Sequence, residues 1–226
     1  MDWLTSFFSQ YGALLAQGTW DTIVMTVASC AFAYLIGLPM GVAFCVTAQN
    51  GLRPHRSVNA VLGCIINIGR SIPFIILLVA IIPFTRFVVG TSLGVPGAIV
   101  PLTLSAAPFV ARIVEQSLAE VDASLIEAAQ AFGASTFQII VKVLLRESLP
   151  SLVRGVSITL VNLFGYSAIA GTVGAGGLGD IAIRYGYQRW QADVMVVAVV
   201  LCVVLVQIAQ SAGDHLAKRI DHRKRA

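Results

Sequence analysis

Five long apolar stretches, each almost free of charged residues, constrain the fold of this chain more than any other feature. They cover about residues 22–47, 58–82, 96–114, 156–173 and 194–212. A helix needs about 20 mainly apolar residues to cross the hydrocarbon core of a bilayer. Only helices and closed barrels satisfy the backbone in lipid, and these stretches lack the alternation of barrel strands. The sequence therefore predicts an all-α membrane protein with five transmembrane helices, folded as one domain over residues 1–226.

The composition also favours a membrane protein over a soluble one. The 226 residues are 57% hydrophobic and 12% charged, with a mean hydropathy of +0.85, whereas a soluble domain carries about 25% charged residues. The formal net charge is +4, but the basic residues lie at the ends of the apolar stretches, which indicates orientation in a bilayer rather than nucleic-acid binding. The four cysteines lie inside apolar stretches without a Cys-x-x-Cys pair, as small buried hydrophobic residues do. We expect no metal, no cofactor and no nucleic-acid partner.

The distribution of lysine and arginine predicts the orientation. Most of the basic residues lie in the polar segments after the first and third stretches or in the C-terminal tail, whereas Arg86, Arg184 and Arg189 lie on the opposite side. Because positively charged loops stay in the cytoplasm, we expect the long polar segment and the C-terminus there, and the N-terminus outside. The cytoplasmic set is Arg53, Arg56, Arg112, Lys142, Arg146, Arg154, Lys218, Arg219, Arg223, Lys224 and Arg225.

The longest polar segment, about residues 115–150, predicts two short helices. Ser124 and Glu127 fit a capping box, so a helix is expected to start there. Gly133 can adopt the left-handed conformation that ends a helix. Ser135 and Gln138 fit a second capping box. The second helix would carry one apolar stripe, made of Phe137, Ile140, Val141, Leu144 and Leu145. By spacing alone, this segment is either a knob that inserts into a groove on a cytosolic partner or an ordinary loop packed on its own helix ends.

A set of residues in this segment resembles a known motif. Their spacing is similar to the EAA loop of ABC importer permeases of the binding-protein-dependent type. In that family the loop docks onto the ATPase subunit and transmits its closure to the membrane helices, so the resemblance implies an ATPase-coupling role here. One departure is Arg146, where the family pattern often has proline, so we expect the second helix to continue further. The matching residues are Glu127, Ala128, Ala129, Gly133, Val143 and Leu145.

The resemblance extends over most of the chain and is strongest to the methionine-import permeases of that family. It implies a homodimer in the membrane, two cytosolic ABC ATPase subunits and an extracytoplasmic methionine-binding protein. The chain has no Gly-x4-Gly-Lys-Ser/Thr sequence, so ATP would be hydrolysed by a separate subunit and this chain would not be an enzyme. The segments that carry the resemblance are residues 69–78, 82–86, 89–92, 99–103, 107–112, 165–167 and 174–179.

The favoured function is therefore the permease subunit of an ATP-driven importer of methionine in the cell membrane, which is the inner membrane if the source has two. Import of another amino acid is the first alternative. A secondary transporter or channel without an ATPase is a second, disfavoured by the EAA motif and by the scarcity of acidic residues in the spans. An intramembrane enzyme is a third alternative. It is disfavoured because the spans contain no nucleophile–base pair and no metal-binding cluster.

Two groups of polar residues are candidates for the transport pathway or its gate. Arg70, followed by Ser71 and Pro73, lies inside the second stretch, where a charge is costly unless it meets water or a partner. Its alternative role is a hydrogen bond to carbonyls freed by the proline. The second group lies on the fourth stretch and consists of Asn162, Tyr166 and Ser167. These side chains either line the pathway or form hydrogen bonds between helices.

Glycines and prolines suggest further features of the spans. Gly37-x3-Gly41 permits close approach of another helix, and proline is expected to bend its helix at Pro39, Pro73, Pro101 and Pro108. The run Gly174–Gly179 matches a dinucleotide fingerprint but follows a membrane helix rather than a strand. A flexible external turn or gate beside the fourth span, or a plain loop, is expected instead.

The N-terminal segment has two possible structures. Apolar residues recur at helical spacing there, which is typical either of a short amphipathic helix on the membrane surface or of the start of the first span. They are Leu4, Phe7, Phe8, Tyr11, Leu14 and Leu15.

Overall fold

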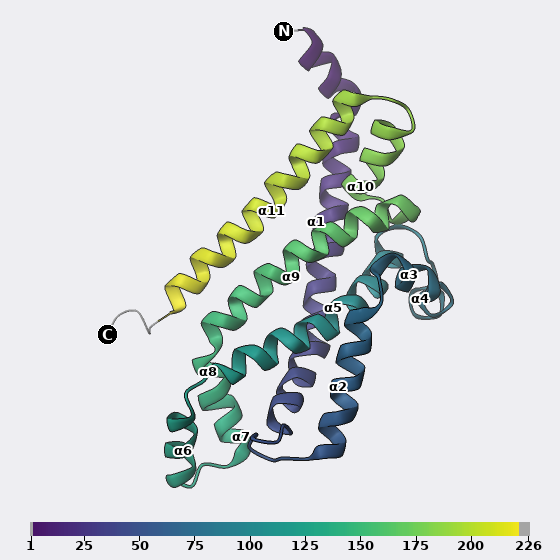
Figure 1. Cartoon of the computed structure of the whole chain (residues 1–226). Coiled ribbons are helices and arrows are strands. Elements are labelled where there is room, and N and C mark those ends of the chain that lie inside the picture. Colours follow the sequence, from purple (N-terminus) through teal and green to yellow (C-terminus); the bar gives the residue numbers. More distant parts are fainter. Residues whose placement is uncertain (1, 222–226) are drawn as a thin grey trace. The chain divides into compact units, whose positions relative to one another are not determined.

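A computed structural model describes residues 2–221 of the chain, with side chains from Thr5 onward. Every regular element within this range is helical (Figure 1), so the prediction of an all-α membrane protein is confirmed. Four helices are long and apolar enough to cross a membrane, or five if the broken pair α2 and α3 counts as one span. The side chain of Leu4 and the tail residues Arg223, Lys224 and Arg225 lie outside the described part of the chain.

The long helices overlap the predicted spans and extend beyond most of them. They are α1 (Asp2–Val46), α2 (Arg56–Ser71), α5 (Gly94–Ala119), α9 (Leu149–Ala170) and α11 (Ala192–Ile220). The short helices are α3 (Phe74–Ala80), α4 (Ile82–Val89), α6 (Ala123–Ala131), α7 (Thr136–Ile139), α8 (Leu145–Glu147) and α10 (Gly177–Ile181). Three wide-turn π segments also occur, η1 (Ile140–Leu144), η2 (Gly171–Ala175) and η3 (Ala182–Tyr187).

The second predicted span is not one helix. α2 ends at Ser71, and α3 begins at Phe74 after Pro73, whose extended backbone (φ −58°, ψ 132°) caps the new helix. Proline disfavours helical backbone at the residue before it and lacks the N–H that would continue the ladder. The predicted bend is therefore a complete break. In contrast, Pro39 and Pro101 lie inside helices that continue past them.

The N-terminal segment is the start of the first long helix rather than a separate surface helix, because α1 runs without interruption to Val46. Phe7 and Leu15 are buried and pack in one cluster with Ile181 and Val194. The amphipathic spacing of the sequence thus marks a face of α1 that packs against other elements of the same protein.

The contacts divide the described chain into two compact units. One contains residues 2–31, 72–105 and 160–209, and the other contains residues 32–71, 106–159 and 210–221. α1, α5, α9 and α11 each supply residues to both units. The prediction of one domain over the whole chain remains a prediction.

The predicted close approach at Gly37 and Gly41 is present in the second unit. A Cβ atom added at Gly37 would lie 2.7 Å from the carbonyl oxygen of Ala107, and one at Gly41 would lie 2.5 Å from that of Ala111. No side chain fits at either position without moving backbone, so the two glycines set the separation between α1 and α5.

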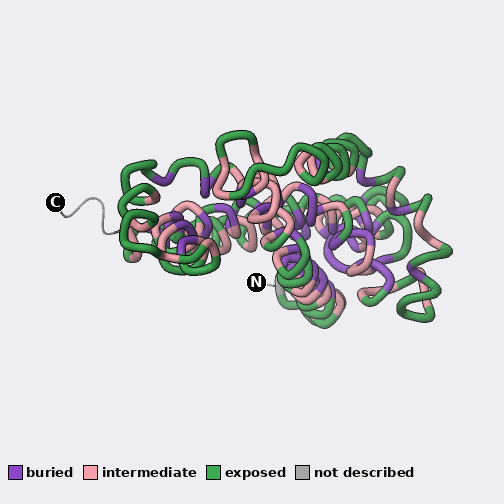
Figure 2. The backbone as a smooth tube through the Cα atoms, turned by 90° about the horizontal axis from the view of Figure 1, so that it is seen from below, coloured by how far each residue is buried: buried purple, intermediate pink, exposed green. Residues whose placement is uncertain are grey.

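Many residues along the helices are exposed (Figure 2). They include large apolar residues such as Leu35, Val196 and Ile208. Only 11% of the most apolar window of α11 is buried. In water such a surface would be unfavourable, whereas in a membrane it faces lipid or another membrane subunit. The burial pattern therefore agrees with the membrane assignment.

Candidate coupling loop and transport pathway

The first helix of the polar segment begins two residues earlier than predicted. α6 starts at Ala123, and its N-cap is Asp122, whose carboxylate accepts a hydrogen bond from the backbone N–H of Ser124 at 2.9 Å. This bond holds the pKa of Asp122 below its usual value. The proposed capping box at Ser124 and Glu127 is therefore wrong, because a carboxylate at Asp122 already satisfies a free N–H group of the first turn.

Gly133 ends α6 as predicted. Its φ is +78°, in the left-handed region that favours glycine. The N–H of Gly133 donates to the carbonyl of Gln130 at 2.9 Å, and the N–H of Ala134 donates to that of Ala129 at 3.0 Å. These two bonds form a Schellman turn, which satisfies the last carbonyls of the helix and reverses the chain. A Cβ at Gly133 would meet nothing within 4 Å, so glycine is needed here for its backbone conformation rather than for space.

The second capping box is confirmed. The Ser135 hydroxyl accepts from the N–H of Gln138 at 3.3 Å, and the Gln138 side chain accepts from the N–H of Ser135 at 2.8 Å. α7 therefore begins at Thr136, directly after the turn. The end of α6 and the start of α7 are thus each capped by local hydrogen bonds that satisfy their backbone groups.

The residues of the predicted apolar stripe divide between buried and exposed positions. Helix α7 continues into η1, where the turn widens to five residues. As a result Ile139 and Leu144, which are five residues apart, are both buried, whereas Val141 is exposed. A stripe drawn at 3.6-residue spacing misses this change of period.

Two large aromatic side chains flank the glycine turn and face outward. Phe132 is 91% exposed and Phe137 is 74% exposed. The sequence predicted Phe137 as part of the apolar stripe, and it predicted no role for Phe132. A phenylalanine at the end of a helix, beside the glycine that stops it, was the available signal. Exposed aromatic residues at the tip of a capped loop are typical of a protein–protein contact.

The predicted coupling residues occupy different positions within this loop. Glu127 and Ala128 are exposed on α6, and no ion pair within residues 2–221 involves Glu127. Ala129 is half-buried, and its carbonyl accepts one bond of the Schellman turn. Val143 and Leu145 are half-buried in η1 and α8. Ala129 and Gly133 therefore belong to the Schellman turn, and Glu127 and Ala128 precede it on the exposed part of α6. Val143 and Leu145 belong to the helical stretch that follows α7.

Arg146, where the family pattern often has proline, lies within a helix. Arg146 is exposed in α8, which ends at Glu147, and Pro150 lies in the first turn of α9. Proline is well tolerated in the first turn of a helix. The helical segment after Gly133 thus extends past Leu145, as expected.

A cavity of about 460 Å³ lies next to α6. Its polar groups come from Glu115, Glu127, Gln130 and Asn50. The rest of the lining comes from the ends of α1 and α5, the turn after α1, α6 and Leu144. α6 is therefore not packed tightly along its length, and its exposed carboxylate can reach a partner side chain.

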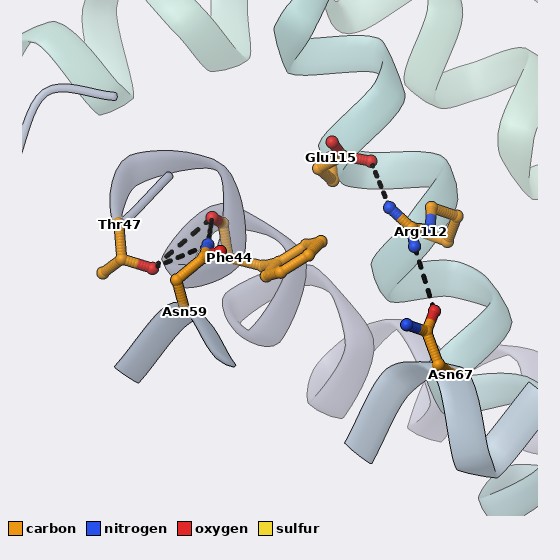
Figure 3. A network of polar contacts seen from close by, with 6 residues as sticks. All are labelled: Phe44, Thr47, Asn59, Asn67, Arg112 and Glu115. Carbon is orange, nitrogen blue, oxygen red and sulfur yellow. Dashed lines mark hydrogen bonds and ion pairs between the residues drawn. The ribbon is translucent and has the colours of Figure 1, made fainter. Parts of the chain in front are cut away.

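A network of polar contacts joins α1, α2 and α5 (Figure 3). The Arg112 guanidinium donates to Asn67 at 3.0 Å and to Glu115 at 3.3 Å, and it lies 5.3 Å from the centre of the Phe44 ring. The Asn59 amide donates to the carbonyl of Phe44 at 2.8 Å. These bonds link α1, α2 and α5.

The polar segment of residues 115–150, the candidate coupling loop, is hydrogen-bonded to the turn after α1. The Nε of Arg53 donates to the Thr136 hydroxyl at 3.1 Å, at the start of α7. The turn itself is closed by backbone bonds from Arg53 to Val46 and from His55 to Thr47, both at 3.0 Å. The bond from Arg53 therefore joins the start of α7 to the turn that follows α1.

The first group of pathway candidates lies at the break between α2 and α3. Arg70 is exposed in the last turn of α2 and has no ion pair among the described residues. The Ser71 hydroxyl donates to the carbonyl of Asn67 at 2.8 Å. Pro73 caps α3, and its carbonyl accepts from Ile76 and Leu77. Arg70 is thus available to a partner or to water.

The second group divides between exposed and packed positions on α9. Asn162 is exposed. The Tyr166 ring stacks on Phe74, with centres 4.8 Å apart and an interplanar angle of 10°. Ser167 is buried, and its hydroxyl donates to the carbonyl of Phe164 at 2.8 Å. The Tyr166 ring therefore packs on α3, and the Ser167 bond stays within α9, so neither is the hydrogen bond between helices that was the alternative role. Asn162 keeps the exposure that a pathway residue needs.

The second half of the glycine run Gly174–Gly179 is tightly packed, because Gly177, Leu178 and Gly179 are buried, whereas Gly174 is exposed. Leu178 is fully buried, and its N–H donates to the Thr22 hydroxyl at 2.9 Å. Gly177 has a φ of +78°, and a Cβ there would lie 2.7 Å from that hydroxyl. A Cβ at Gly179 would lie 2.4 Å from the carbonyl oxygen of Ala168. Glycine at positions 177 and 179 therefore permits close backbone approach, and the run forms the end of η2 and the start of α10 rather than a plain loop.

Comparison with protein families identifies the chain. Residues 33–222 match the model of the binding-protein-dependent transport system inner membrane component. The chain belongs to this family. The matched range includes the whole coupling loop and both groups of pathway candidates.

Close relatives of this permease are known. The probable D-methionine transport system permease protein MetI of Vibrio cholerae is 51% identical over 97% of this chain and 98% of the relative. The probable MetI of Haemophilus influenzae is 49% identical over 93% and 99%. The D-methionine transport system permease protein MetI of Escherichia coli K12 is 52% identical over 70% and 73%.

Solved structures support the same fold for the permease. An inward-facing MetNI methionine ABC transporter contains a chain with 50% sequence identity and a TM-score of 0.93, matched over 94% of this chain and 99% of that chain. A chain of an amino acid ABC transporter with histidines has a TM-score of 0.78 at 17% identity, over 97% and 99%. At that identity the likeness shows the fold alone.

Proposed function

We propose that this permease is the membrane-spanning subunit of an ATP-driven importer that takes up methionine, including its D-enantiomer. The observation that carries the proposal is its close identity to permeases named for D-methionine transport over nearly their whole length. The match to the MetNI methionine ABC transporter supports it. Import of another amino acid is the alternative that the uptake experiment below distinguishes.

The loop geometry supports docking of an ABC ATPase subunit on the cytoplasmic side. Phe132 and Phe137 form an outward-facing apolar tip on either side of Gly133. Glu127 and Ala128 lie on the exposed face of α6. A cleft on the ATPase would bury the two rings, and burial of a large aromatic side chain at an interface is strongly favourable.

The supports of the loop suggest how ATPase movement reaches the membrane. The turn at Gly133 is held by two backbone bonds, and the bond from Arg53 to Thr136 ties α7 to the turn after α1. Because packed cores shift between discrete arrangements rather than deforming continuously, closure of the ATPase would move α6 and α7 together. Val143 and Leu145 would carry that movement to α9. The bonds of Arg112 would carry it to α2, where Arg70, Ser71 and Pro73 adjoin the break.

The orientation and assembly complete the proposal. The coupling loop and the C-terminus would be cytoplasmic and the N-terminus extracytoplasmic, since the basic residues concentrate on the loop side. The permease would act as a homodimer, with methionine delivered by an extracytoplasmic binding protein. It would need no cofactor of its own, since it lacks a phosphate-binding loop sequence.

Uptake into proteoliposomes tests the function. The permease is reconstituted with its ATPase and its binding protein, and uptake of labelled L-methionine, D-methionine and a control amino acid is measured with and without ATP. We expect ATP-dependent uptake of both methionine enantiomers that disappears when any of the three components is omitted. Uptake of only the control amino acid would refute the substrate, and uptake that persists without the ATPase would refute the mechanism.

A further inference from the structure

A small cavity of about 140 Å³ lies within the first unit, beside α3 and α4. Its walls are mostly apolar, with side chains that include Leu78, Ala98, Ala170 and Val173. The polar exceptions are Thr85 and Ser92. A buried water needs two to four polar partners, so these walls hold water poorly and favour an apolar ligand.

The Thr85 hydroxyl combines two features, a buried position without a hydrogen-bond partner among the described residues and a place in the wall of this cavity. Thr85 is only 2% exposed, and its Oγ1 has no hydrogen-bond partner within residues 2–221. The buried Thr22 instead donates to the carbonyl one turn back, at 2.8 Å. Thr26 and Thr103 share the unpaired state of Thr85, but neither lines this cavity. Because an unpaired buried polar group costs stability, its position at a cavity wall suggests that a ligand supplies the partner.

A cationic group lies next to the same cavity. The Nε of Arg86 donates to the hydroxyl of Ser92, one of the lining residues, at 3.1 Å. Arg86 is exposed and has no ion pair among the described residues. The remaining N–H groups of a guanidinium fit a carboxylate in a bidentate arrangement. A group that can bind a carboxylate, the Arg86 guanidinium, is therefore hydrogen-bonded to Ser92 in the wall of the apolar cavity.

The size of the cavity selects among ligands. A cavity of about 150 Å³ holds a ligand of the size of benzene, which has six heavy atoms, whereas the thioether side chain of methionine has four. The acyl chain of a lipid is several times larger than this space. The combination fits an α-amino acid whose side chain is apolar and of moderate length.

We propose that this cavity is a transit site of the permease, in which the apolar side chain of the imported amino acid occupies the cavity and its carboxylate pairs with Arg86. The Thr85 hydroxyl donates to the thioether sulfur or to a carboxylate oxygen of the bound amino acid. This inference rests on the proposed function, because it names the contacts that the imported methionine makes inside the membrane subunit.

Substitutions distinguish a substrate contact from a structural role. In the complete transporter, with saturating methionine-loaded binding protein, Thr85→Val should lower the uptake rate about 2- to 10-fold, and Thr85→Ser should retain it. Thr85→Val should leave thermal stability unchanged or raised, since it removes an unpaired buried hydroxyl. Thr26→Val is the matched control: it removes the same kind of group away from the cavity and should leave uptake unchanged. Arg86→Gln should lower uptake about 10-fold or more, and Arg86→Lys less.

Photolabelling locates the site directly. A diazirine analogue of methionine is added to the reconstituted transporter, irradiated and mapped by mass spectrometry. We expect labelling within residues 78–101 that excess methionine competes and that Ala98→Leu, which fills the cavity, reduces. Labelling there that methionine does not compete would indicate a lipid-accessible crevice and overturn the proposal. Absence of methionine uptake by the wild-type transporter would refute the proposed function. Wild-type uptake in the Thr85, Arg86 and Ala98 variants would refute the transit site alone.

Discussion

Replacing Gly133 is predicted to uncouple transport from ATP hydrolysis, because this residue sets the angle between α6 and α7. In the structure its φ is +78°, and an added Cβ meets nothing within 4 Å. The cost of Gly133→Ala is therefore that of placing an L-residue in the left-handed region, about 1–2 kcal/mol. The reduced freedom of the unfolded chain offsets about 0.4–1 kcal/mol of that. A net cost of about 1 kcal/mol lowers the ratio of formed to unformed turn about fivefold.

The assay compares methionine imported with ATP hydrolysed in proteoliposomes. Gly133→Val should lower this ratio more than Gly133→Ala, since a β-branched residue tolerates a positive φ least. Gly133→Asn should stay close to wild type, because asparagine adopts the left-handed conformation readily. Amide exchange at Gly133 and Ala134, whose N–H groups close the turn, should accelerate in parallel. Equal impairment by alanine and asparagine would show that an absent side chain, rather than backbone conformation, is required, and unchanged coupling in all three variants would refute the turn's role.

Three further predictions follow from the same structure. The bond from Ser124 lowers the pKa of Asp122, so its stabilisation of α6 is complete above the ordinary carboxyl pKa and is lost as the pH falls through the lowered value. Asp122→Asn should keep α6 but remove this pH dependence, as measured by amide exchange in α6. Phe132→Ala and Phe137→Ala should each weaken ATPase binding to the permease about tenfold or more in a pull-down titration, and unchanged binding would exclude both rings from the interface. Gly177→Ala should lower the free energy of unfolding by about 2 kcal/mol or more, since it combines a positive φ with a 2.7 Å contact. Thermal unfolding measures this loss, with Gly165→Ala as the control. A Cβ at Gly165 meets nothing within 4 Å, so this substitution should leave the free energy of unfolding unchanged or raise it.

The fold class followed from the sequence because a bilayer imposes one length and one composition on every span. The close approach at Gly37 and Gly41 was also predictable, since small residues permit it directly. The break at Pro73 was underestimated as a bend, because the sequence does not show whether neighbouring contacts will hold a proline-containing helix together.

In the coupling loop, the sequence predicted a helix end correctly where only one residue could cap it. It predicted the helix start wrongly where two neighbouring residues could both act as the N-cap. Gly133 and the Ser135–Gln138 box act through backbone geometry within a few residues, and both were predicted. At the start of α6, Asp122 and Ser124 are both good caps, and spacing alone selected the wrong one. The wide turn of η1 changed which residues are buried, and no sequence period announces such a turn.

The sequence did not predict the close packing of the Gly174–Gly179 run. Its glycines resemble a flexible loop in sequence, yet they allow Thr22 and Ala168 to approach the backbone closely. That role depends on segments far apart in the chain, so no local pattern could reveal it. The same holds for the Arg112 network and for the unpaired hydroxyl of Thr85.

Site-specific crosslinking tests the central claim, docking of the Gly133 tip on an ATPase. A benzoylphenylalanine photocrosslinker is placed at Phe132 and, as the matched control, at Phe87, which is 87% exposed on α4. In membranes containing the complete transporter, position 132 should crosslink to the ATPase subunit, and position 87 should not. A crosslink to the ATPase from position 87 but not from position 132 would contradict both the orientation and the coupling role.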